Sequence, residues 1–146
     1  MRHLEPADVK SMGEFAFKAT TLADVARKTL DGRAAMLEHR HDDAAAAFRE
    51  AAEAQEAHLM DNFDPPTFWF PVRRSLAYAE LAAGRPDRAA AEAHSALARW
   101  AEDPVTLLVL AKADAALGHS KLAARWTAGA RKGWSGALPA LGPAGA

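Results

Sequence analysis

The stretch VRRSLAYAELAAGRPDRAAAEAHSAL (residues 72–97) is followed, 34 residues further along the chain, by TLLVLAKADAALGHSKLAARWTAGAR (residues 106–131). When the two stretches are aligned, Gly84 falls on Gly118. Other small and apolar positions also coincide, namely Leu76 with Leu110, Ala77 with Ala111, Ala89 with Ala123 and Ala96 with Ala130. A period of about 34 residues with helical spacing is typical of stacked helix–turn–helix units. Such units present an extended, curved surface to a partner, so the two stretches predict a fold class and a general kind of function.

The composition also favours helices. Half of the 146 residues are hydrophobic, but there is no isoleucine, and alanine and leucine dominate this half. Alanine and leucine favour helices, whereas β-branched residues favour strands. We therefore expect one all-α domain with a substantial core. The chain has no cysteine, which excludes disulfides, thiolate metal ligands and a cysteine nucleophile.

The charge of the chain does not identify a partner. The net charge is −1, which favours neither nucleic acid nor a membrane surface as a partner. Residues 1–70 carry 8 Lys/Arg and 13 Asp/Glu, whereas residues 71–146 carry 10 and 6. This asymmetry reflects either solvated helix faces or a preference for an acidic partner or head-to-tail self-association. The sequence shows neither an apolar leader nor about 18 consecutive apolar residues, so we expect a cytoplasmic protein.

Capping residues and helix breakers predict six to seven helices. Gly84 and Gly118 suit the left-handed position that ends a helix, and Asp103-Pro104 suits a helix start. Two prolines at residues 65–66 cannot lie inside a helix and place a loop after Met60. The first expected helix begins at Pro6. The second is capped by Thr21 and runs from Leu22 to about Glu38, and the third is capped by Asp42 or Asp43 and runs to about Met60. The remaining expected helices cover 67–83, 86–100, 105–117 and 120–132.

The ends of the expected helical domain, residues 1–132, need to be covered. Phe15 and Phe17 of the first helix are expected to cap one end. Residues 133–146, which are rich in glycine, alanine and proline, are expected to form a flexible tail. The other end, near Trp126 and Trp134, is expected to be partly buried by this tail or by a dimer partner.

The helical hairpins at about 67–101 and 103–132 resemble the tetratricopeptide repeat, in which small and large residues are arranged around a turn glycine. A degenerate copy at about 22–60 has Gly32 at the small position of its first helix and His39 where the other copies have glycine. Its second helix continues the pattern with Ala44, Phe48 and Ala51. The resemblance implies a short right-handed α-solenoid.

A second feature carries the resemblance more specifically. The segment DPPTFWFPVRRSL (residues 64–76), followed by Gly-Arg-Pro at 84–86, is similar to a segment common in bacterial tetratricopeptide-repeat proteins. It overlaps an insertion of 11 residues, 60–70, between the first and second copies. The chain resembles the C-terminal repeats of those proteins. The resemblance implies a non-catalytic scaffold that binds a protein or peptide, and it implies no cofactor.

The resemblance also implies a concave groove lined by the first helix of each hairpin. The groove positions carried over to this sequence are Arg33 and Met36 in the first copy, Arg74, Tyr78 and Leu81 in the second, and Leu108, Lys112 and Ala115 in the third. Arg33, Arg74 and Lys112 are expected either to hold a carboxylate or acidic peptide, or to lie on a solvated face. The lysine and asparagine pairs that hold C-terminal carboxylates in some members of the family are absent.

Three consecutive aromatic residues, Phe68, Trp69 and Phe70, cannot share one face of a helix. We expect two of them to fill the gap left by the insertion and one to be exposed as an interface anchor, with a fully buried triplet as the alternative. Trp134 is expected either to cap the last helix or to contact a neighbouring subunit.

The sequence offers little support for catalysis or metal binding. His39 and His41 lie next to Asp42 and Asp43, but no His-Glu-x-x-His or Glu-x-x-His spacing occurs, so we expect no metal site. An acidic stripe, Glu50, Glu53 and Glu56, is expected to be the solvated side of a helix. We therefore predict no catalytic residue, no enzyme activity and no nucleic-acid or membrane partner. The expected function is an interaction scaffold, and the alternative is a self-associating structural or regulatory subunit, such as a homodimer.

Overall fold

A computed structural model of the chain describes residues 13–60 and 68–142, and of residues 13–18 it describes the backbone alone. These ranges contain six α-helices and no strand, which confirms the all-α class. The helices are α2 (Gly13–Leu37), α3 (His41–His58), α4 (Val72–Ala82), α5 (Pro86–Leu97), α6 (Pro104–Ala116) and α7 (Ser120–Lys132). None of them is long and apolar enough to cross a membrane. The predictions for Pro6 and for the side chains of Phe15 and Phe17 lie outside the described residues.

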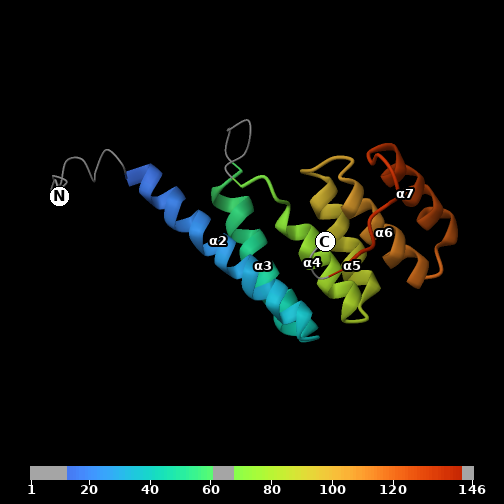
Figure 1. The fold of residues 1–146 in the computed structure, drawn as a ribbon, viewed down its shortest axis with the longest axis horizontal. Helices are drawn as coiled ribbons and strands as arrows, with labels where there is room; N and C mark the ends of the chain where they lie inside the picture. Colours follow the sequence, from blue (N-terminus) through green and yellow to red (C-terminus); the bar gives the residue numbers. More distant parts are fainter. Residues whose placement is uncertain (1–12, 61–67, 143–146) are drawn as a thin grey trace.

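The helices pack in the order of the chain. Each one contacts the next, and α4 also contacts α6. Figure 1 shows the result as an elongated row with α2 at one end and α7 at the other. Turns of a few residues join the two helices of each hairpin and force them to lie antiparallel and side by side, whereas residues 59–71 form a longer connection between α3 and α4.

Small residues allow the helices to approach closely. Ala77, Ala89 and Ala96 are buried, and Leu76 and Leu110 are fully buried beside them, as the aligned stretches predicted. In the first hairpin Gly32 has the same role. A Cβ atom at this position would lie 2.6 Å from Cε1 of Phe48, which is itself buried. In the first hairpin the glycine on α2 thus leaves room for a large aromatic residue on α3.

The turns inside the three hairpins have the same conformation. Gly84 and Gly118 have φ angles of 75° and 81°, as predicted for left-handed caps, and His39 has a φ angle of 60°. In each turn the next backbone N–H donates to a carbonyl five residues earlier, which is the Schellman arrangement. These bonds are Arg40 to Ala35 (2.9 Å), Arg85 to Glu80 (3.0 Å) and His119 to Asp114 (2.8 Å). The first hairpin therefore follows the other two in spite of its histidine.

Two predicted helix starts are wrong. Thr21 begins no new helix, because α2 runs without a break through residues 20–21. β-branched residues lower helix propensity only slightly, and packing against α3 outweighs that cost. Asp42 and Asp43 do not cap α3 but lie in its first turn, where their negative charges interact favourably with the positive end of the helix dipole.

The boundaries of the later helices agree better with the sequence. The helix expected over 67–83 begins only at Val72, because Pro71 occupies the cap position in an extended conformation. α5 ends at Leu97 rather than at Trp100. Both remaining helices lie within about a residue of the prediction, and the Asp103 side chain caps α6 by accepting from the N–H of Thr106.

Candidate functional site

A buried glutamine of α3 fixes the segment that precedes α4. Gln55 is 2% exposed. Its Nε2 atom donates to the carbonyl oxygens of Phe68 (2.9 Å) and Phe70 (2.7 Å). Its Oε1 atom accepts from the N–H of Val72 at 3.2 Å. One side chain thus satisfies three backbone groups of a non-helical segment, and this anchors the segment to α3.

The three consecutive aromatic residues divide between core and surface. Phe68 and Phe70 pack against the core cluster of α2, α3 and α4. Trp69 is 72% exposed, and its ring is nearly perpendicular to that of Phe70. This confirms that two residues fill the gap and one is exposed, and it excludes the fully buried triplet. The predicted reason was wrong, because the triplet precedes α4 instead of lying in it.

Two arginines from different helices lie against the ring of Phe70. The guanidinium carbon of Arg33, on α2, is 4.9 Å from the ring centroid, and that of Arg74, on α4, is 4.8 Å away. Arginine faces are attracted to aromatic rings in this geometry. Both Nε atoms are buried without a hydrogen-bond partner in the described part of the chain. We call Arg33, Phe70 and Arg74 the arginine–aromatic stack.

The stack brings together two of the three cations predicted for the groove. Arg74 also donates from Nη1 to Asp103 at 3.0 Å, so a carboxylate already partly neutralises its charge. Lys112 lies exposed on α6, and no contact joins it to the stack within the described residues. Of the three predicted groove cations, Arg33 and Arg74 therefore lie together, whereas Lys112 lies apart from them.

The other carried-over groove positions differ in exposure. Met36 is buried in the core of the first hairpin, so its expected place in the groove is wrong. Tyr78 is half-buried between the core clusters on either side of α4, and Leu81 packs against the second of these. Leu108 is buried, whereas Ala115 is exposed.

Sequence reasoning missed two partly buried ion-pair networks. Glu80 is 1% exposed and accepts from Arg49 (2.7 Å) and Arg85. Arg73 donates to Glu56 (2.6 Å) and to Glu92 (2.6 Å). The hydrogen bonds that Arg73 donates to Glu56, and then the one that it donates to Glu92, raise the pKa of Arg73 well above its ordinary value despite the opposing effect of burial.

These networks correct the view of the acidic stripe on α3. Glu56 is not simply a solvated residue, because it joins α3 to α4 through Arg73. Glu50 pairs with Lys28 of α2 at 2.7 Å, whereas Glu53 is exposed as expected. The partners of these ion pairs lie on different helices and far apart in the sequence, so the spacing of the charges does not predict them. Only the packing of the helices shows which charges meet.

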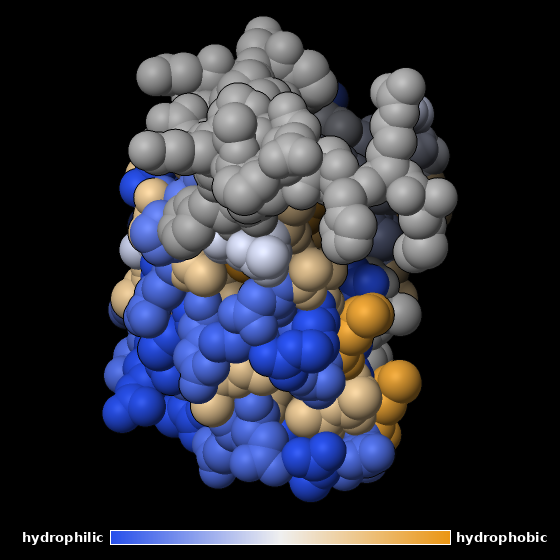
Figure 2. Space-filling model, turned by 90° about the vertical axis from the view of Figure 1, so that its left-hand side faces the viewer, coloured by the Kyte–Doolittle hydropathy of each residue, from blue (hydrophilic) through white to orange (hydrophobic). Residues whose placement is uncertain are grey.

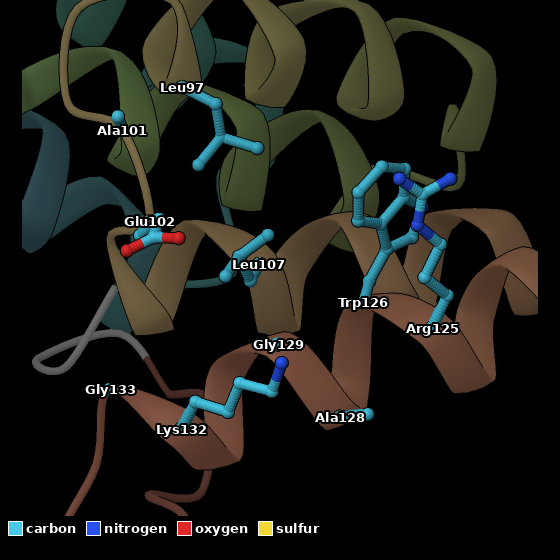
Figure 3. A pocket seen from close by; sticks show the side chains of 10 residues that line it. All are labelled: Leu97, Ala101, Glu102, Leu107, Arg125, Trp126, Ala128, Gly129, Lys132 and Gly133. Carbon is cyan, nitrogen blue, oxygen red and sulfur yellow. The ribbon is translucent and has the colours of Figure 1, made fainter.

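A hollow lies between α5, α6 and α7, away from the arginine–aromatic stack. Its volume is about 620 Å³. Figure 3 shows Leu97, Leu107 and Trp126 facing it from the three helices, with Arg125 and Lys132 at its edge. The Trp126 indole N–H donates to buried Asp114 (2.7 Å), and the Arg125 guanidinium lies over the Trp126 ring. No nucleophile paired with a base lines this hollow.

Nothing in the described ranges brings together three His, Cys, Asp or Glu side chains that could hold a metal ion. The rings of His39 and His41 are in edge contact at 5.9 Å, and Nδ1 of His41 is buried without a hydrogen-bond partner in the part of the chain that the structure describes. Comparisons with known proteins found no matching family model, no matching curated protein and no matching solved structure.

Proposed function

We propose that the protein is a non-catalytic interaction scaffold, a short right-handed α-solenoid of tetratricopeptide-like hairpins. In this proposal a peptide or partner protein binds along the face formed by α2, α4 and α6, the first helices of the hairpins. The three matching turns and the packing of the helices in chain order support the repeat architecture. The proposal includes a cytoplasmic location, and it involves no cofactor, nucleic acid or membrane.

The observation that carries this proposal is the arginine–aromatic stack. Its two guanidinium groups come from different helices, and half-buried Arg33 has no carboxylate partner in the described part of the chain, whereas Arg74 pairs with Asp103. A carboxylate can accept from such groups in charge-assisted hydrogen bonds. Exposed Lys112 adds a cation on α6, and exposed Trp69 adds an aromatic surface next to the stack. The face therefore suits an acidic peptide.

The test is selection of peptides from a displayed random library on the full chain. We expect selected peptides to carry carboxylates and to bind the Arg33→Glu and Lys112→Glu variants about 10-fold more weakly or worse. Lys121→Glu, on an exposed position of α7, is the matched control for net charge and should leave binding unchanged. Equal affinity for all of these proteins would place the peptides elsewhere and refute the proposed face.

Self-association is a second candidate function, favoured by exposed apolar residues at both ends of the row. Leu30 and Leu37 of α2 are 63% and 66% exposed, and Leu122 and Trp134 are exposed at the α7 end. Figure 2 looks at the α2 side and shows hydrophobic residues at one edge of a largely hydrophilic face. The two halves of the chain also differ in charge, because residues 1–70 carry 13 Asp/Glu and 8 Lys/Arg, whereas residues 71–146 carry 6 and 10.

Sedimentation at low and high salt tests this second candidate. A head-to-tail assembly should form at low salt and dissociate as salt screens the charges. Leu30→Ser/Leu37→Ser should weaken the assembly at every salt concentration. A monomer under all these conditions would exclude self-association and leave the scaffold proposal intact.

A further inference from the structure

The chain that follows α7 returns across the helices that form the proposed binding face. Figure 1 shows it running from the end of α7 back over α6 toward α4. Leu138 packs against the cluster of Leu107, Leu108 and Ala130. Leu141 packs against this cluster and against a second one, which joins α4, α5 and α6 through Ala77, Ala93, Val109 and Leu110. We call residues 133–142 the return segment.

Two glycines make this return possible. A Cβ atom at Gly133 would lie 2.9 Å from Cγ of Pro104, so only glycine lets the segment leave α7 so close to the start of α6. Gly136 has a φ angle of 94°, which side-chain-bearing residues rarely adopt. The path of the segment thus depends on two specific residues, and it is not that of an arbitrary tail.

Helix α6 shows why the segment lies where it does. Nine of the residues between Val105 and Asp114 are buried, so α6 is covered on almost every side. Leu108 is 9% exposed, although it occupies a position assigned to the groove. Besides Leu97 and Trp126 of the neighbouring helices, Leu138 and Leu141 of the return segment pack against the cluster that contains Leu108.

The segment is held by apolar contacts alone. In the described part of the chain, no hydrogen bond or ion pair connects residues 134–142 to the helices. Leu138 and Leu141 both remain partly exposed. They are three residues apart on either side of Pro139, and three residues is the repeat of the extended polyproline conformation that proline favours. Another segment with the same spacing could therefore take their place.

We propose that the return segment is a built-in ligand of the α4–α6 surface, and that the partner of this surface is an extended peptide with two aliphatic side chains three residues apart around a proline. This inference rests on the proposed function and names the chemistry of the partner. Because the segment is tethered, it competes at a high effective concentration. The partner binds only to the fraction of molecules whose segment has left the surface.

The experiment uses the full chain and a labelled synthetic peptide with the sequence of residues 135–142. Binding is measured by fluorescence anisotropy to the wild type and to Leu138→Ser/Leu141→Ser. We expect the double variant to bind the peptide about 10-fold more tightly than the wild type, because its own segment no longer competes. A peptide with serine in place of both leucines should bind neither protein, and Leu122→Ser, on exposed α7, should behave as the wild type.

A second variant covers the case in which the double variant folds poorly. Gly136→Val disturbs the turn but removes no side chain that packs on α6, so it should increase peptide affinity in the same direction. Equal affinity of the peptide for the wild type and for both folded variants, or binding to none of them, would overturn the inference. A wild-type dimer that the double variant converts to a monomer would also overturn it, since the segment would then occupy a second copy.

The outcome also distinguishes this inference from the proposed function. If library peptides bind at Arg33 but the 135–142 peptide never binds, the scaffold proposal stands and the inference fails. If the 135–142 peptide binds the variants but library peptides ignore Arg33 and Lys112, the inference stands and the acidic-peptide proposal fails.

Discussion

Replacing Gln55 by leucine removes the anchor of the aromatic segment while keeping a side chain of similar size. The wild-type amide makes three hydrogen bonds to the backbone, at 2.9, 2.7 and 3.2 Å. Each such bond contributes about 0.5–1.5 kcal/mol net, so their loss amounts to about 1.5–4.5 kcal/mol. Leucine recovers part of this by burying apolar surface. We expect the free energy of unfolding to fall by about 2 kcal/mol.

Urea denaturation followed by circular dichroism measures this loss directly. The free energy of unfolding of a typical domain is about 5–15 kcal/mol, so a change of this size is well resolved. Hydrogen exchange of the Val72 amide adds a local readout, because this N–H loses its acceptor in the variant. Its protection should drop more than that of amides in α6 or α7.

Glu53→Leu is the matched control, since Glu53 lies exposed on the same helix. It should change the free energy of unfolding by no more than about 0.5 kcal/mol. The reasoning fails if Gln55→Leu is as stable as this control and the Val72 amide stays equally protected. In that case the three hydrogen bonds would contribute nothing to holding the segment against α3.

Two further predictions concern packing and buried charge. Gly32→Ala gains about 1 kcal/mol of helix propensity but forces a methyl group against the Phe48 ring, at a cost of about 1–3 kcal/mol, so the protein should lose stability or at best show no gain. In α7, a Cβ atom at Gly129 would lie 3.4 Å from Cδ1 of Leu107, which is an ordinary contact, so Gly129→Ala should stabilise the protein. Thermal melting measures both variants, and equal shifts of their melting temperatures would contradict this prediction. Arg73→Met leaves the carboxylates of Glu56 and Glu92 close together without their shared cation. Urea titration should show that the free energy of unfolding falls by about 1–3 kcal/mol, which is less than for a fully buried pair because all three side chains keep some exposure.

The repeat determines which parts of the fold can be predicted. Where the 34-residue alignment holds, the boundaries of α6 and α7, the left-handed turn glycines and the buried alanines all agree with the sequence. These features depend on local rules, namely capping, glycine conformation and helical spacing. The start of α4 was misplaced, because the proline at 71 permits either a first-turn position or a cap, and local rules do not decide between them.

The candidate site was harder to predict than the fold because it depends on contacts between distant residues. Nothing near Gln55 in the sequence shows that its amide satisfies backbone groups up to 17 residues away. Arg73 and Arg74 are neighbours with the same chemistry, yet one lies between two glutamates and the other lies on Phe70. Adjacent positions on a helix point about 100° apart, so the surroundings of each are set by the neighbouring helices.

The insertion between the first two hairpins has a consequence for specificity. A loop that merely lengthened the connection would leave the surface between α2 and α4 open to many ligands. Here Gln55 fixes the backbone on both sides of Trp69, and two guanidinium groups fix the ring of Phe70. The stack is therefore preorganised, and a ligand that binds it loses little free energy to ordering the protein. The α4–α6 surface, by contrast, must first release its own segment. If both proposals hold, one partner binds the stack readily and completes its contacts only by displacing Leu138 and Leu141. Its binding then depends both on a carboxylate at the stack and on two aliphatic side chains around a proline.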